Sequence, residues 1–265
     1  MLMLIKVLLL SIVEGVTEFL PISSTGHLLL VSHYLNMKKE FYEVFDIAIQ
    51  LGAILAVISL YPNYFKGALK KPLRFENKIM AIAMLPILII GFLFKDVVKQ
   101  VLFNPLIIFL GLMIGGIALI IIDIAVPKQV DQTDKKEGVS LIQAAIIGGF
   151  QCLALWPGMS RSAMTIMGGM IAGLNRVTSA SFSFLLAVPL MIIIVCYDLV
   201  SSIGNLSINE FGWIFLGIVC SYVVSFFTIK WFLGFVKNKG LLVFGVYRII
   251  IATIGILITY DILHI

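Results

Sequence analysis

The chain has 265 residues, of which 61% are hydrophobic and only 12% are charged, with a mean hydropathy of +1.11. A soluble domain of this size has too little interior to bury so much apolar surface, so the composition indicates a polytopic helical membrane protein. The net charge of +5 does not indicate a nucleic-acid partner, because the basic residues fall in short loops between apolar runs, where they suit topology control and lipid contact.

A polar run from Glu14 to His27 interrupts the first apolar stretch of the chain, and Pro21 lies in its middle. Proline removes a backbone donor and disfavours helix in the residue before it. Each flank is shorter than the roughly 20 residues that a full crossing needs. We therefore expect residues 1–35 to form a re-entrant helical hairpin, with its irregular backbone covered by protein or by a watery cavity.

The same order of elements then occurs twice along the chain. Three apolar runs of spanning length follow the first hairpin, at residues 44–61, 79–94 and 105–126. After a polar loop at 127–138, a second broken stretch at 139–173 precedes three more spans, at 180–199, 211–235 and 241–263. The pattern predicts one membrane domain, residues 1–265, built from two repeats, residues 1–126 and 139–265, each a hairpin plus three transmembrane helices.

The order of crossings predicts the topology. A re-entrant hairpin returns to its own side and three spans then cross, so the second hairpin enters from the opposite face and the repeats are inverted. Most loop charges fall on one side: Lys66, Lys70, Lys71, Arg74, Lys78, Lys128, Lys135, Lys136, Arg176, Lys237 and Lys239. The other side has Lys38, Lys39, Lys95 and Lys99. The positive-inside rule then places both termini outside and predicts an extracytoplasmic opening for the site.

Two carboxylates open the first polar run. Glu14 and Glu18 are four residues apart, so on a helix they project from one face. Such neighbours repel each other unless a cation or a shared proton intervenes. Two interpretations remain open: a divalent ion such as Mg²⁺ or Ca²⁺, which prefers oxygen ligands, or a protonated carboxyl group bonded to the hairpin backbone.

Hydroxyl groups follow Pro21 at the expected start of a helix, in Ser23, Ser24 and Thr25. Helix starts bind anions, because free N–H groups and the helix dipole point there, although simple capping is the alternative. His27 lies one turn after Ser24, close enough to hydrogen-bond it. The pair is a candidate nucleophile with its base or acid.

The second break carries one arginine among hydroxyls. Arg161 is flanked by Ser160 and Ser162, with Gly158 before it and Thr165 one turn after it. Arginine stays charged in proteins and therefore requires an anion in an apolar hairpin. That anion is either a carboxylate of the first run or a phosphate, which the guanidinium recognises with two parallel bonds. Glycine permits close backbone approach, and the pattern is not a Walker loop.

Other polar residues inside the spans have simpler interpretations. Asp46 and Gln50 open the first span and are candidates to line a cavity. Arg248 lies near the start of the last span, where snorkelling to the interface would explain it. Asp123 lies near the end of a span and needs no function.

Together the two motifs resemble the undecaprenyl-diphosphate phosphatase family, also known as the bacitracin-resistance proteins. The first matches as Glu14-Gly15-x-Thr17-Glu18-Phe19-Leu20-Pro21-x-Ser23-Ser24-Thr25-Gly26-His27. The second matches as Pro157-Gly158-x-Ser160-Arg161-Ser162-x-x-Thr165, and the stretch Phe182–Pro189 is also similar to the family's.

The resemblance implies hydrolysis of the terminal phosphate of a C55 polyprenyl diphosphate in the plasma membrane of a bacterium, which regenerates the lipid carrier of peptidoglycan synthesis. It also implies a divalent cation, an interdigitated inverted repeat and a homodimer. The catalytic positions correspond to Glu18, Ser24, His27 and Arg161, with Glu14 and Glu18 as metal ligands. The implied phosphate cradle comprises Ser23, Thr25, Gly158, Ser160, Arg161, Ser162 and Thr165. A lipid-phosphate transporter or flippase remains the alternative, because inverted repeats with broken helices are transporter architecture.

Overall fold

The computed structural model describes residues 2–35, 37–71, 74–102, 104–126, 138–202 and 208–263, and the regular elements within these ranges are all helical. Six helices are long and apolar enough to cross a membrane. They cover Phe41–Leu60, Phe75–Leu93, Pro105–Ala125, Arg176–Tyr197, Glu210–Lys239 and Leu242–Tyr260. The predicted class, an all-α protein that crosses the membrane several times, is confirmed.

The first half of the chain follows the predicted order, with additional short helices between the spans. Its long elements are α1 (Leu2–Thr17), α2 (Ser24–Leu35), α3 (Lys39–Leu60), α5 (Phe75–Leu93) and α7 (Pro105–Ala125). The additional ones are α4 (Pro62–Lys70), α6 (Lys95–Val97) and the π-helix η1 (Val98–Leu102). Pro62 occupies the first turn of α4, where a missing N–H costs nothing, so this proline starts a helix.

The second half has the same alternation. Its elements are α8 (Leu141–Cys152), the 3-10 helix η2 (Leu153–Leu155), α9 (Arg161–Ile171), α10 (Arg176–Ser202), α11 (Ile208–Lys239) and α12 (Leu242–Leu263). A capping box starts α8: the Ser140 side chain accepts from the Gln143 N–H, and the Gln143 side chain accepts from the Ser140 N–H.

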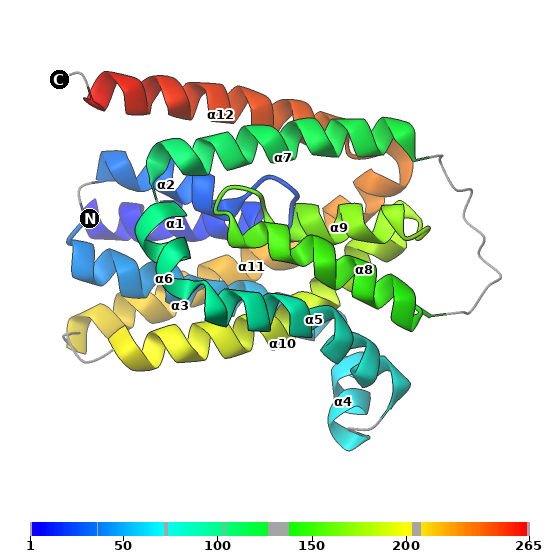
Figure 1. The fold of residues 1–265 in the computed structure, drawn as a ribbon. Helices are drawn as coiled ribbons and strands as arrows, with labels where there is room; N and C mark the ends of the chain where they lie inside the picture. Colours follow the sequence, from blue (N-terminus) through cyan, green and yellow to red (C-terminus); the bar gives the residue numbers. More distant parts are fainter. Residues whose placement is uncertain are drawn as a thin grey trace.

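The two hairpins enter the bundle from opposite ends. In Figure 1, α1 begins and α2 ends at the end where α12 finishes, whereas α8 begins and α9 ends at the other end. The turns of the two hairpins meet inside the bundle, where the Ser162 hydroxyl donates to the Leu20 carbonyl at 2.7 Å. Opposed entry is what the sequence predicts. The exact repeats, residues 1–126 and 139–265, stay a prediction, and most of the connecting loop, 127–137, lies outside the described residues.

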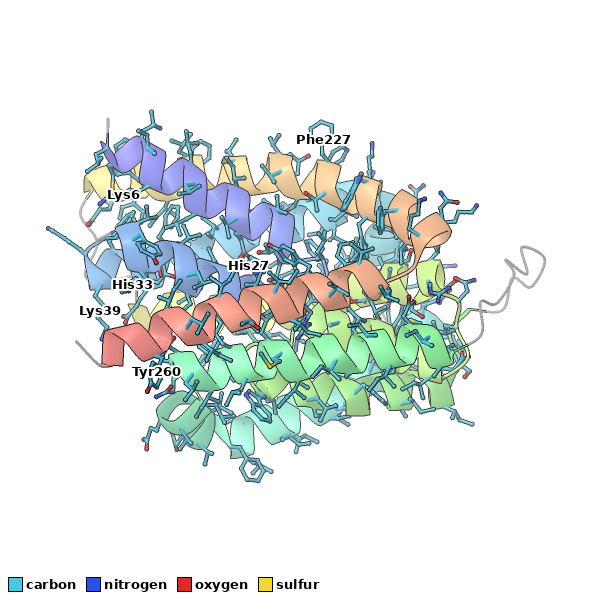
Figure 2. The ribbon with its side chains drawn as sticks, turned by 90° about the horizontal axis from the view of Figure 1, so that it is seen from above. Lys6, His27, His33, Lys39, Phe227 and Tyr260 are labelled. Carbon is cyan, nitrogen blue, oxygen red and sulfur yellow. The ribbon has the colours of Figure 1, made fainter. Side chains whose placement is uncertain are left out.

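The largest buried cluster surrounds the turns of the hairpins. It joins Phe19 of the first turn and Met159 of the second to side chains of α3, α7, α9, α10, α11 and α12. Apolar side chains on the outside of the bundle, such as Phe227 in Figure 2, face outward where a bilayer would cover them. The largest buried cluster therefore packs around the two irregular turns and supports them inside the bundle.

Asp123 has a structural function that its position near a span end did not predict. One carboxylate oxygen accepts from Arg176 Nε at 2.7 Å. The other accepts from the backbone N–H groups of Leu241 and Leu242, both at 3.0 Å. This carboxylate thus joins the end of α7 to the starts of α10 and α12.

Candidate active site

Each hairpin turn ends in a serine with a positive φ. Ser23 has φ 68° and precedes α2, and Ser160 has φ 71° and precedes α9. Residues other than glycine rarely adopt such values, which cost about 1–3 kcal/mol and cluster at functional sites. The two turns therefore share a local conformation as well as a location.

A cavity of about 200 Å³ lies between the two turns. Both hairpins contribute to it, with additional side chains from α3 and α10. Its lining comprises Glu18, Ser23, Ser24, Thr25, Gln50, Ala154, Pro157, Gly158, Ser160, Arg161, Met191 and Ile194. The cavity thus brings together Glu18, Ser24 and Arg161, which the sequence predicted to be catalytic.

Glu18 connects the two half-sites. Its Oε1 accepts from Arg161 Nη2 at 3.1 Å, and its Oε2 accepts from the Ser24 hydroxyl at 2.6 Å. The side chains of Arg161 and Glu18 are only 13% and 12% exposed, so little water screens the pair. Arg161 Nη1 also donates to the Ser183 carbonyl at 3.2 Å. The sequence left two partners open for Arg161, a carboxylate or a phosphate, and the structure shows the contact with a carboxylate.

His27 does not bond to Ser24, which corrects the pairing expected from the one-turn spacing. Its Nδ1 lies 2.8 Å from the Ser23 carbonyl, which can only accept, so Nδ1 carries the proton. In the neutral ring, Nε2 then accepts from the Tyr247 hydroxyl at 2.8 Å. Figure 2 shows His27 about halfway along the molecule, inside the bundle. Its ring orientation is thus fixed from both sides.

The hydroxyls expected to bind phosphate separate into two sets. Ser23, Thr25 and Ser160 line the cavity together with Gly158 and Arg161. Ser162 and Thr165 are buried outside that lining. Ser162 donates to the Leu20 carbonyl, and the Thr165 hydroxyl lies 2.6 Å from that of Ser183 and donates to the Arg161 carbonyl at 2.9 Å. Their observed contacts stabilise the turns.

Gly158 lets the second turn pack against α7. Its φ is +93°, which favours glycine. A Cβ added there would overlap the backbone carbonyl of Ile108 on α7. The close backbone approach predicted for this glycine is therefore observed, with α7 as the neighbour.

Glu14 is fully buried, and neither of its carboxylate oxygens has a hydrogen-bond partner among the described residues. A buried carboxylate without donors needs a proton or a cation. The described residues contain no group of three or more His, Cys, Asp or Glu side chains placed to hold a metal. The donor set still suits Mg²⁺, which usually binds one or two carboxylates and takes its other ligands from water and substrate phosphate.

Arg248 does not snorkel, and the interpretation made from the sequence is wrong. The residue is fully buried, and its guanidinium donates to the carbonyls of Pro21, Leu112, Gly158 and Met159 at 3.0–3.1 Å. It therefore binds the first turn, the second turn and α7 at once. An ionisable residue at membrane depth is itself a signal of function, and that signal could have identified Arg248.

The sequence also missed Tyr247, and it gave Asp46 only as one of two candidates for the cavity lining. Tyr247 orients His27, but a single tyrosine near the start of an apolar span gives no signal in a sequence. Asp46 was only a candidate for the cavity lining, and the lining includes Gln50, one turn later on α3, rather than Asp46. The Asp46 Oδ1 is nevertheless buried without a hydrogen-bond partner among the described residues.

Fold and site together define a multi-pass helical membrane protein whose polar site forms between two opposed re-entrant hairpins. The family described as "Bacitracin resistance protein BacA" matches residues 7–254. A protein of Clostridium tetani named "Undecaprenyl-diphosphatase" is 43% identical over 261 residues, 96% of each chain. A protein of Aquifex aeolicus with the same name is 43% identical over 94% of this chain and 96% of its own. The chain belongs to the bacitracin resistance protein BacA family.

Proposed function

We propose that this chain is an integral membrane phosphatase that hydrolyses the terminal phosphate of undecaprenyl diphosphate, giving undecaprenyl phosphate and inorganic phosphate. The product is the lipid carrier of peptidoglycan synthesis, and its recycling would confer resistance to bacitracin. The relatives' names support this substrate. The observation that carries the proposal is the continuous contact from Arg161 through Glu18 to Ser24 across a cavity between the hairpins.

Arg161 would bind the terminal phosphate. A guanidinium binds phosphate with two parallel hydrogen bonds, and one oxygen of Glu18 is its competing partner. Phosphate binding would draw Arg161 toward the substrate and free one oxygen of Glu18 from its ion pair. Ser23, Thr25 and Ser160 would complete the cradle with hydroxyl and backbone donors.

Glu18 would act as the general base. Its Oε2 already accepts from the Ser24 hydroxyl at 2.6 Å, within the range that proton transfer requires. Ser24 Oγ would attack the terminal phosphorus as its proton passes to Glu18, and the bond from phosphorus to the bridging oxygen would break. Water would then hydrolyse the phosphoserine. In the alternative, Ser24 positions a water that attacks directly. His27 would hold the turn that carries Ser24, since its Nδ1 donates to the Ser23 carbonyl, and it would move a proton only if its ring turned toward Ser24 when substrate binds.

If Glu18 is not the base, it would instead hold the divalent cation, Mg²⁺ or Ca²⁺, together with Glu14. The unpartnered oxygens of Glu14 support this assignment. Such an ion neutralises charge on phosphate oxygens during phosphoryl transfer. We also propose an extracytoplasmic opening in the plasma membrane: the basic helix α4 lies at the end opposite to the start of α1 (Figure 1), and basic loops are cytoplasmic. A homodimer stays a prediction, testable by light scattering of the purified protein.

The test is phosphate release by purified protein in detergent, without any ion gradient. Wild type should release phosphate from undecaprenyl diphosphate in the presence of Mg²⁺ or Ca²⁺, and Glu18→Gln should lose about 100-fold or more, as expected for a general base. Glu43→Gln is the matched control, because Glu43 is an exposed residue paired only loosely with Lys39. A transporter would bind the lipid and leave it intact.

Ser24→Ala distinguishes the two routes of attack. A covalent route predicts a trappable phosphoserine in wild type and loss of most activity in the variant. Full activity in Ser24→Ala would exclude the covalent route and leave water activated by Glu18.

A further inference from the structure

Helix α10 changes its surroundings partway along its length. Most of its residues up to Met191 are buried, but Ile192, Ile193 and Ile194 are all exposed. Consecutive helical residues point 100° apart, so three exposed residues in a row open more than half of the helix circumference. Val195, one turn after Met191, is buried again.

The seam between α5 and α10 is closed in one half and open in the other. In the closed half, Met84 and Ile87 of α5 share a buried cluster with Leu186 and Leu190 of α10. One turn further along, the side chains of both helices are exposed: Ile90, Phe92 and Leu93 on α5, and Ile192, Ile193 and Ile194 on α10. Beyond Ile87 and Leu190 the two helices therefore present exposed apolar side chains instead of sharing a buried cluster.

The polar cavity reaches this exposed part of α10. Its lining is polar beside the hairpin turns and apolar at Ala154, Met191 and Ile194. Ile194 is 44% exposed, so one side chain belongs both to the cavity wall and to the outer surface. Leu153, next to Ala154 on η2, is also exposed. The cavity thus meets the lipid-facing surface between η2 and α10.

The cavity volume limits what the site can enclose. Pockets that enclose whole drug-sized ligands measure about 300–1,000 Å³. This cavity measures about 200 Å³, enough for a diphosphate group beside Arg161 but too small for a polyprenyl chain as well. An apolar chain attached to a bound diphosphate must leave by an apolar route into the bilayer, because exposing it to water is costly.

We infer that the gap bordered by Ala154, Met191 and Ile194 is the portal through which the polyprenyl chain of the substrate passes from the diphosphate site into the lipid. The inference rests on the proposed function, and it makes these three residues determinants of chain-length preference. Phosphate groups bind at the hairpin turns, the first isoprene unit stays within the cavity, and the units that follow pass the side chain of Ile194.

The test compares long and short substrates in two variants of neighbouring residues. Ile194→Trp narrows the portal, whereas Ile193→Trp places the same bulk on an exposed residue, 49% accessible, that does not line the cavity. Ile194→Trp should lower kcat/KM for undecaprenyl diphosphate about tenfold or more, and for a five-carbon prenyl diphosphate less than about twofold. Ile193→Trp should change neither value appreciably.

A photo-cross-linking arm covers the case in which Ile194→Trp does not fold. Benzoylphenylalanine at position 194 should label radioactive undecaprenyl diphosphate, and the same group at position 193 should not. Equal loss for both substrates in a folded Ile194→Trp protein, unchanged kinetics in that variant, or equal labelling from both positions would each overturn the portal. The proposed function fails separately, if wild type releases phosphate from neither substrate.

Discussion

The two hairpins have turns of similar shape but different chemistry and different burial. Both turns end in a serine with positive φ. However, α9 is buried continuously from Ser162 to Met170, whereas α2 buries only Gly26, His27 and Leu28. The second hairpin, which carries the arginine Arg161, is thus surrounded by protein along its second helix. The first hairpin, which carries Glu14, Glu18 and the candidate nucleophile Ser24, is more exposed. Under the proposed function, the second turn would position the phosphate and the first would react with it.

Arg248 is the element that both turns share. It contacts the Pro21 carbonyl of the first turn and the Gly158 and Met159 carbonyls of the second. Gly115 on α7 makes room for it, because an added Cβ would overlap the guanidinium. Together with the Ser162–Leu20 and Arg161–Glu18 contacts, this arginine therefore lets a rigid second turn fix the position of the first.

Replacing Arg248 should lower the stability of the protein more than any other variant here, because this side chain bonds to both turns. Arg248→Met removes several charged hydrogen bonds, each worth about 1.5–3 kcal/mol in favourable cases, and leaves buried carbonyls without donors. We expect a loss of about 3–5 kcal/mol, or about 10 °C in the thermal unfolding midpoint in detergent.

The matched control is Arg74→Met, since Arg74 pairs with Glu76 and both side chains are partly exposed. Exposed pairs contribute about 0–1 kcal/mol, so its midpoint should shift by at most a few degrees. Equal shifts for the two variants would mean that Arg248 does not hold the turns together.

The next largest effect is expected from replacing Arg161, the charged residue of the second turn. Arg161→Lys keeps a cation near Glu18 but removes the planar fork that suits phosphate. We expect kcat/KM for undecaprenyl diphosphate to fall about 10²–10³-fold, the usual loss when one transition-state donor is removed. Arg176→Lys is the control, because Arg176 pairs with Asp123 away from the cavity. Near-normal turnover in Arg161→Lys would place the phosphate elsewhere.

Much of the fold could be predicted because its signals are local. Hydrophobic length defined the spans, and Pro21 and Pro157 marked the breaks. Charged groups inside apolar stretches identified both Glu18 and Arg161, which the structure brings into contact. The roles of these residues in catalysis stay predictions, since contact alone does not establish chemistry.

The orientation of side chains in the turns could not be predicted in the same way. A helical register placed Ser24 beside His27, but Ser24 opens α2 and points back to Glu18 across the turn. The prediction for Arg248 was wrong for a different reason. Its backbone partners come from segments more than 80 residues away, so only the tertiary structure identifies them. The local sequence therefore shows which charged side chains are costly to bury. The partners that offset this cost come from distant parts of the chain and are known only from the structure.

Tyr247 tests how far the first turn depends on support from α12. Tyr247→Phe removes the donor to His27 Nε2, a hydrogen bond worth about 0.5–1.5 kcal/mol. We expect kcat to fall about three- to tenfold with KM nearly unchanged, because the imidazole loses its orientation while the phosphate ligands remain. Tyr34→Phe removes the same group from an exposed ring and should have no effect. Unchanged kcat in Tyr247→Phe would remove His27 from the mechanism.

The smallest effect distinguishes the two strained serines from each other. Glycine relieves a positive φ, but it costs about 0.4–1 kcal/mol in backbone entropy. Ser160 caps α9 by accepting from the Ala163 N–H at 3.2 Å and also contacts the Ser162 hydroxyl at 2.9 Å. Ser160→Gly loses these contacts as strain is relieved, so its thermal midpoint should stay level or fall slightly. Ser23→Gly should gain up to about 1 kcal/mol, or about 2–4 °C. Equal rises in both variants would show that the cap contributes nothing and that the second turn owes its rigidity to the burial of α9 alone.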